Sequence, residues 1–180
     1  MDYQKHRENQ IKRLLTKEND DGRFGRIFEL ECRRKKSRQI GIGDHNQKDV
    51  SVKFLVNGKI QYLPAECKTN GGRIDGYFDG SIYGKFTIYR LEFTQKLKIE
   101  NEYRYIPPIV IPNDLFIALL EDVKAIKAIN KNGVLDGYGI QVSSKKLFNR
   151  LNDYVNRYGS KVLFDNEKTF DMNDFIDMIL

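Results

Sequence analysis

The sequence predicts an α/β protein: an α/β/α sandwich around a central mixed sheet of about four strands, with helices at both ends of the chain. Helix-like periodicity runs to about residue 37 and resumes at about residue 113, and strand-like segments lie between. No repeat or long linker divides the chain. With 180 residues and 40% hydrophobic content, it is expected to form one domain over residues 1–180.

The first two helices are expected over residues 2–18 and about 23–37. Asp20-Asp21-Gly22 interrupts the periodicity between them, and either aspartate can cap the second helix.

A β-hairpin is predicted over residues 49–68. Asn57-Gly58 separates two alternating segments, and both residues tolerate the positive φ of a two-residue turn. Such a turn pairs residues whose numbers sum to 115, unless Pro64 introduces a bulge. The first strand then divides into an apolar face (Val50, Val52, Phe54, Val56) and a polar face (Asp49, Ser51, Lys53).

Two more strands are expected over residues 85–94 and 103–111, the second confined to a sheet edge by Pro107-Pro108. Helices should follow over about 113–129, capped by Asn113, and to about 158, capped by Ser143 or Ser144. The tail from Asp165 should end in an amphipathic helix. The apolar positions assigned to these helices are Leu115, Leu119, Val123, Ile126 and Ile129, then Leu147, Leu151 and Val155, and finally Phe175, Ile176, Ile179 and Leu180.

The net charge of +6 is unevenly distributed. From Asp165 onward five acids face one base, so residues 1–164 carry +10. Such a basic body favours a polyanion such as nucleic acid, or an anionic surface, although solvated lysines would have the same composition. No apolar segment approaches the roughly 18 residues that span a bilayer, and the N-terminus lacks the hydrophobic stretch of a secretory signal. A cytoplasmic protein is therefore expected, with Cys32 and Cys67 reduced and no zinc-ligand spacing.

The hairpin register brings two acids together. Asp49 and Glu66 also sum to 115, so their carboxylates should face each other across the two strands, roughly 5 Å apart at Cβ. Like charges in this position repel, and a divalent cation between them reverses the penalty. Lys68 lies on the same face of the strand as Glu66. The arrangement predicts a metal site with an adjacent lysine, and a solvated polar hairpin face is the alternative.

These residues give the chain a resemblance to the PD-(D/E)xK nuclease superfamily. The matching residues are Lys48-Asp49-Val50 and Glu66-Cys67-Lys68 on adjacent strands, preceded by a helix with Gly25-Arg26-Ile27-Phe28-Glu29. The resemblance covers about residues 22–70, and Lys48 stands where the family has proline. It implies a restriction endonuclease-like catalytic core over about residues 22–111, followed by a C-terminal helical part over about 112–180.

The resemblance implies that Asp49, Glu66 and the backbone carbonyl of Cys67 bind Mg²⁺, for which Mn²⁺ substitutes. Hard oxygen ligands suit that ion. Lys68 is then the residue that orients or deprotonates the attacking water. The helical acid of the family is assigned to Glu29 from the Gly25–Glu29 spacing. Helical geometry instead groups Glu31 with Phe24, Ile27 and Phe28, so Glu31 remains a rival.

The expected DNA contacts are the basic helix end Arg33, Arg34, Lys35 and Lys36, together with Asn70 and Arg73 beyond the second strand. Six aromatic residues can also stack on bases, or belong to the core: Tyr77, Phe78, Tyr83, Tyr89, Tyr103 and Tyr105. The first functional hypothesis is a Mg²⁺-dependent DNA endonuclease of the type II restriction class, acting as a homodimer because two strands require two active sites. The alternatives are a Holliday-junction resolvase-like nuclease and a non-catalytic nucleic-acid-binding protein that keeps the fold.

Overall fold

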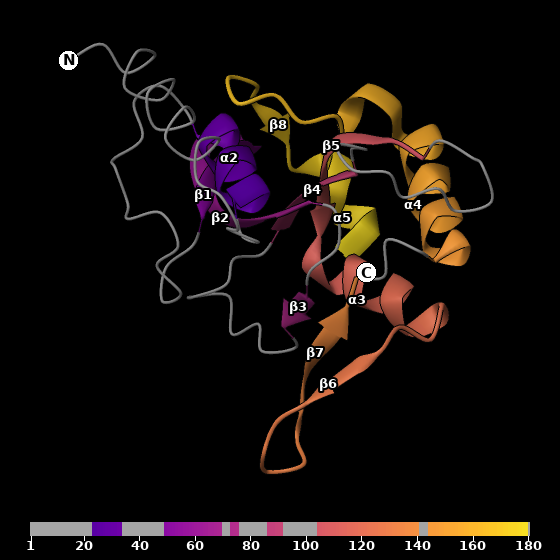
Figure 1. The fold of residues 1–180 in the computed structure, drawn as a ribbon. Coiled ribbons are helices and arrows are strands. Elements are labelled where there is room, and N and C mark those ends of the chain that lie inside the picture. Colours follow the sequence, from indigo (N-terminus) through magenta and orange to yellow (C-terminus); the bar gives the residue numbers. More distant parts are fainter. Residues whose placement is uncertain are drawn as a thin grey trace.

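The computed structural model describes residues 23–33, 49–69, 73–75, 86–91, 104–140 and 144–179. Within these ranges the chain forms a five-stranded sheet, a smaller three-stranded sheet and helices packed around them (Figure 1). The expected helix over residues 2–18 lies outside the described residues. In chain order the elements are α2 (Arg23–Cys32), β1 (Val50–Val56), β2 (Lys59–Thr69), β3 (Arg73–Asp75), β4 (Phe86–Leu91), β5 (Ile106–Pro112), α3 (Asn113–Asp122), β6 (Lys127–Ile129), β7 (Leu135–Gly139), α4 (Lys145–Tyr158), a 3₁₀ turn (Gly159–Lys161), β8 (Phe170–Asp171) and α5 (Asn173–Ile179).

The hairpin prediction is confirmed. Asn57 and Gly58 adopt φ values of 50° and 76°, as a two-residue turn with both central residues in the left-handed region requires. β1 and β2 pair antiparallel in the 115 register, from Val56 with Lys59 to Val50 with Ala65. Pro64 pairs directly with Ser51, so no bulge interrupts the register. The alternation is also confirmed, because Val50, Val52 and Phe54 are buried and the residues between them are only half-buried.

The main sheet is mixed, as expected, and has five strands in the order β5-β4-β2-β1-β8. β1 with β2 and β4 with β5 are antiparallel, whereas β2 with β4 and β1 with β8 are parallel. The sheet curls, and β2 occupies its centre. Sequence analysis missed β8, a two-residue strand in the acidic tail whose Phe170 pairs with Phe54. β5 is an edge strand, which agrees with Pro107-Pro108, since proline cannot donate a ladder hydrogen bond.

An aromatic cluster joins the two halves of the chain. Phe54 of β1 stacks on Phe86 of β4 at a centroid distance of 4.6 Å, and Phe175 of α5 meets Phe54 edge-on at 5.5 Å. Phe170 of β8 lies 5.7 Å from Phe54. All four side chains are almost completely buried. The C-terminal residues therefore complete the core beneath the hairpin, and they hold β1 in place from the side opposite β2.

Three helix predictions need correction. The helix expected over about 23–37 ends at Cys32, and Arg33 lies in a bend after it. The helix expected over 113–129 ends at Asp122, because Lys124 adopts a φ of 54° and the chain turns into β6; Ile126 and Ile129 are consequently 66% and 56% exposed. The residue at its N-cap is Pro112 rather than Asn113. In α5, Phe175 is buried as expected, but Ile176 is exposed and Met178 is buried in its place. α4 is confirmed, with Ser144 as the cap that accepts a hydrogen bond from the Leu147 amide.

None of the helices within the described ranges is long and apolar enough to cross a membrane.

Replacing Gly58 by alanine should lower the free energy of unfolding by about 1 to 2 kcal/mol, because an L-residue is strained at this positive φ. An added Cβ would meet no atom within 4 Å, so the backbone alone accounts for the cost. Urea denaturation measures it. Gly133→Ala should lose a similar amount, since Gly133 has the same φ of 76° and equally open surroundings. A Gly58→Ala protein as stable as wild type would contradict the turn.

Candidate active site

The two predicted acids lie at the open end of the hairpin. Asp49 is the residue before β1, one position beyond the last pair, Val50 with Ala65. Its Oδ2 accepts a hydrogen bond of 2.8 Å from the backbone N–H of Cys67. The N–H and C=O of one strand residue point to the same neighbouring strand. The Cys67 carbonyl is therefore also directed toward the side on which Asp49 lies.

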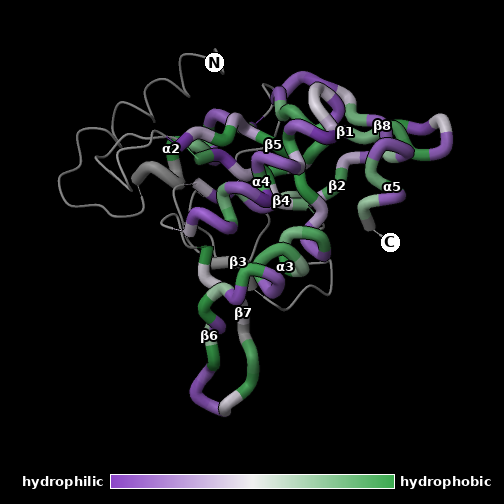
Figure 2. The backbone as a smooth tube through the Cα atoms, turned by 90° about the vertical axis from the view of Figure 1, so that its right-hand side faces the viewer, coloured by the Kyte–Doolittle hydropathy of each residue, from purple (hydrophilic) through white to green (hydrophobic). Residues whose placement is uncertain are grey.

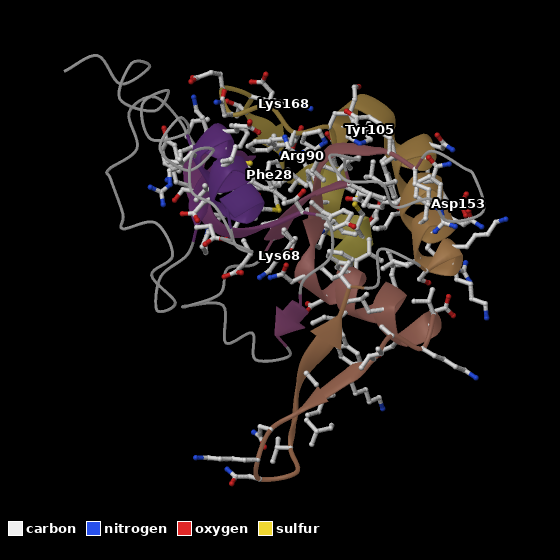
Figure 3. All side chains as sticks on the ribbon, in the orientation of Figure 1. Phe28, Lys68, Arg90, Tyr105, Asp153 and Lys168 are labelled. Atoms are coloured by element: carbon white, nitrogen blue, oxygen red, sulfur yellow. The ribbon has the colours of Figure 1, made fainter. Side chains whose placement is uncertain are left out.

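Glu66 and Lys68 share one face of β2, as predicted, and both are half-buried. The Lys68 ammonium nitrogen lies 3.4 Å from Glu66 Oε2. Neighbouring strand β4 places Thr87 beside Glu66 and Tyr89 beside Lys68. The pairs of β2 with β1 end at Ala65, so the parallel pairing with β4 holds the backbone from which these two side chains extend. Lys68 is labelled in Figure 3, near the end of β2 that leads toward β3.

Helix α2 packs on β2 and contributes a third acid. Glu29 is buried, with 6% of its surface exposed. Burial, followed by the negative charge of Asp49, raises its pKa from 4.5 to about 7, and the charge of Glu66 acts in the same direction. Coulombic effects of this kind require proximity. Asp49 and Glu66, from two other segments, therefore lie near enough to Glu29 for their charges to act on it.

The residue directly after this helix is a buried base. Arg33 is 5% exposed and pairs with Glu29, one helical turn earlier. Its positive charge and hydrogen bond lower the pKa of Glu29, opposing the effect of burial. Arg33 was expected to contact phosphates from an exposed helix end, and a guanidinium buried against Glu29 does not have that exposure in this structure. The i, i+4 spacing of opposite charges was a signal for the observed pair.

Glu31, the rival of Glu29, points elsewhere. Its carboxylate accepts a 2.8 Å hydrogen bond from Arg90 of β4, and 42% of its side chain is exposed. The Arg90 guanidinium also covers the ring of Phe28 at 4.3 Å, and these two residues lie together in Figure 3. The helical-wheel argument that placed Glu31 on the buried face and Glu29 away from it was wrong. α2 is covered on more than one side, as Ile27, Phe28, Glu29 and Leu30 are all buried in succession.

The donor set fits a hard cation. Burial raises the pKa of Asp49, whereas the Cys67 amide and the charges of Lys68 and Arg33 lower it. No group of three or more His, Cys, Asp and Glu side chains in the described ranges is placed to hold a metal ion. The predicted set needs only two carboxylates and one carbonyl, which is the usual number of protein ligands for Mg²⁺. Oxygen atoms of Asp49, Glu66 and the Cys67 backbone meet that requirement by donor type.

The thiols are unsuited to act as ligands. Cys32 and Cys67 are both buried and free, as predicted. Burial and a hydrogen bond with Cys32 raise the pKa of the Cys67 thiol well above its usual value. Only a thiolate binds a metal well. The site is therefore one of oxygen donors, and the two sulfur atoms belong to the packing of α2 on β2.

The remaining predicted contacts are largely beyond the described residues. Arg34, Lys35, Lys36 and Asn70 lie outside them. Arg73 begins β3, where its backbone pairs with Gly139 of β7. Of the aromatic candidates, Tyr89 is buried and packs on Phe116, and Tyr105 is 46% exposed.

Comparison of the chain with protein-family models, curated proteins and solved structures gives no significant match.

Glu29 should make the protein less stable as the pH rises. Its pKa of about 7 in the folded protein lies above the ordinary value of 4.5, so the folded state binds the proton more tightly. Without added divalent ions, the free energy of unfolding should fall by up to about 3 kcal/mol between these pH values. The raised pKa of Asp49 acts with the same sign. Denaturant titrations at a series of pH values measure the effect.

Glu29→Gln should remove most of this fall, and Glu31→Gln, the same change on the same helix, is the control. A Glu29→Gln protein that keeps the full wild-type pH dependence would contradict the assignment.

Proposed function

We propose that this protein is a metal-dependent DNA endonuclease that hydrolyses phosphodiester bonds, most similar in kind to type II restriction enzymes. The observation that carries the proposal is the buried acid Glu29, whose pKa is raised by burial and by the charges of Asp49 and Glu66, with Lys68 beside Glu66. A buried carboxylate kept close to other negative charges is costly, and such groups are concentrated at functional sites. An exposed polar hairpin face would not gather a buried helical acid as well.

Asp49, Glu66 and the Cys67 carbonyl are the residues that would hold Mg²⁺. When bound, the ion would polarise the scissile phosphate and activate water. The hydrogen bond from the Cys67 amide fixes Asp49 against the end of β2, which supports its role as an oriented ligand. The pairing of Glu66 with Thr87 of β4 fixes its backbone, which supports the same role for Glu66.

Lys68 and Glu29 would carry the proton chemistry. The ammonium of Lys68 would orient the attacking water and stabilise the negative charge that develops on the phosphoryl oxygens. Glu29, with a pKa of about 7, can accept and release a proton near neutral pH. Arg33 would act as a positioning residue, since its ion pair orients Glu29 and limits the rise of its pKa.

The detailed fold class is part of the same proposal. A curled mixed sheet with α2 packed on its central strand is compatible with a restriction endonuclease-like α/β/α core over about residues 22–111. Residues 112–180 would then complete the core and provide DNA contacts. Cleavage of both strands would require two copies of the chain.

The direct test is cleavage of plasmid DNA with Mg²⁺ or Mn²⁺. Wild type should cut, whereas Asp49→Ala and Lys68→Ala should lose activity by at least about 10²-fold, because each removes an oriented charge at the reacting phosphate. Lys53→Ala is the matched control, as Lys53 is half-buried on β1 at a distance along the strand from the acids.

The choice of substrate separates the nuclease classes. Discrete fragments from a linear duplex indicate sequence recognition, whereas cutting confined to a four-way junction indicates a resolvase. DNA binding without cleavage under any divalent ion would contradict the enzymatic proposal.

Metal binding can be tested without cleavage. Mg²⁺ at about 100 times its dissociation constant should stabilise wild type by about 2.7 kcal/mol, because it binds only the folded site. Asp49→Asn and Glu66→Gln should each abolish most of this gain, and Glu31→Gln should retain it. Thermal unfolding with and without Mg²⁺ measures the shift. Equal stabilisation of all four proteins would place the ion elsewhere.

A further inference from the structure

The three-stranded sheet projects a two-stranded arm from the body of the protein. We define the β6–β7 arm as residues 123–139, in which β6 and β7 pair antiparallel around a turn at 130–133 (Figure 1). Among the described residues the arm is held at its base, where β7 pairs with β3 and the Gly139 amide donates to the Ile126 carbonyl at 2.8 Å. The arm takes no part in the candidate active site, so its exposed side chains need another explanation.

Apolar and basic side chains are both exposed on this arm. Ile126, Ile129 and Val134 are 66%, 56% and 45% exposed. Lys124, Lys127 and Lys131 are exposed as well. Figure 2 shows the two strands as mainly hydrophobic and the turn between them as hydrophilic. An arm of this composition offers positive charge and apolar surface together.

Two acids of α3 at the base of the arm have partners. Glu121 accepts a 2.6 Å hydrogen bond from the Tyr138 hydroxyl, and Asp122 pairs with Arg150 of α4 at 2.7 Å. Between residues 123 and 139 the sequence contains three lysines and one acid, Asp136. The arm therefore presents a net positive charge to its surroundings.

The turn that displays the outermost lysine is well ordered by its own hydrogen bonds. Asn130 Oδ1 accepts from the amides of Asn132 and Val134, at 2.9 and 3.1 Å. The Gly133 amide donates to the Asn130 carbonyl, and Gly133 takes the positive φ that closes the turn. Lys131 is thus presented from a fixed backbone, which reduces the entropy lost when it binds.

We propose that the β6–β7 arm lies in the major groove of duplex DNA and contacts its phosphates through Lys127 and Lys131. This inference rests on the proposed nuclease function and names the surface by which that enzyme holds its substrate. B-DNA has a major groove about 12 Å wide, which admits a two-stranded β-ribbon. The lysines match the phosphates, and exposed Ile129 and Val134 match thymine methyl groups and sugars.

Chain connectivity places the arm near the active site. β3, to which the arm is attached, begins four residues after Thr69, so the two positions are at most roughly 14 Å apart. Lys68 lies near that end of β2 (Figure 3). From Gly139 to Gly133 the arm extends for roughly 20 Å, at about 3.3 Å per residue. That length corresponds to roughly six base pairs of duplex beside the cleaved bond.

A second copy of the chain is a weaker match for this surface. Pairing two arms would bring like-charged lysines together, which is unfavourable. DNA complements that charge.

Salt dependence of binding tests the proposal. Binding of a 30-base-pair duplex is measured by fluorescence anisotropy in Ca²⁺, from low to moderate salt. Lys127→Gln/Lys131→Gln should weaken binding and reduce the slope of log K against log salt by about 2, because each lost phosphate contact removes about 0.9. The control Lys59→Gln/Lys146→Gln removes two exposed lysines, one at the start of β2 and one in α4. It should change the slope less.

The outcomes separate this inference from the proposed function. Unchanged DNA binding and an unchanged salt slope in the arm variant, with cleavage intact, would contradict DNA contact by the arm but not the proposed nuclease function. A reduced salt slope in the arm variant, together with no cleavage by wild type, would support DNA contact by the arm and contradict the proposed nuclease function. Equal affinity for an RNA duplex would overturn insertion in the major groove, since that groove is deep and narrow in A-form helices. An Ile129→Asp variant that turns a dimer into a monomer but keeps the wild-type slope would identify the arm as a dimer contact instead.

Discussion

The hydrogen bond from the Cys67 amide to the Asp49 carboxylate is the interaction on which the candidate site depends. The backbone ladder between β1 and β2 ends at the pair of Val50 with Ala65, so it does not include Asp49. Beyond this last pair, the carboxylate of Asp49 accepts the hydrogen bond of the Cys67 amide in β2. A carboxylate that takes over a backbone ladder position is fixed by the sheet itself. The turn at Asn57-Gly58 sets the register, and through it the position of Asp49 relative to Glu66.

Local sequence rules predicted this part of the molecule well. The positive φ values of Asn57 and Gly58 and the alternation of β1 follow from a few neighbouring residues, and Pro107-Pro108 correctly indicated an edge strand. Tertiary packing decided the rest. Glu29 is buried because α2 is covered on several sides, which a helical wheel with one apolar face cannot represent. β8 was not predicted because a strand of two residues is too short to show an alternating hydrophobic pattern.

The end of α3 illustrates a different limit. Residues 113–129 contain apolar residues at helical spacing, and nothing in that spacing excludes a helix to residue 129. The chain leaves the helix at Lys124 through a left-handed residue that is not glycine, and β6 then pairs with β7. Ile126 and Ile129 consequently become part of an exposed strand. The same residues that misled the helix prediction are those that distinguish the arm as an interaction surface.

Charge balance connects the burial of α2 with the proposed chemistry. The five ionisable groups of the site are three acids, Glu29, Asp49 and Glu66, and two bases, Arg33 and Lys68, so with every group ionised they sum to −1. Burial makes that excess costly, which is why the pKa of Glu29 rises to about 7 despite its ion pair with Arg33. A divalent cation would change the sum to +1 and remove the mutual repulsion of the carboxylates. A phosphate diester carries one negative charge, so a site with that balance would be neutral only with its metal and substrate both present.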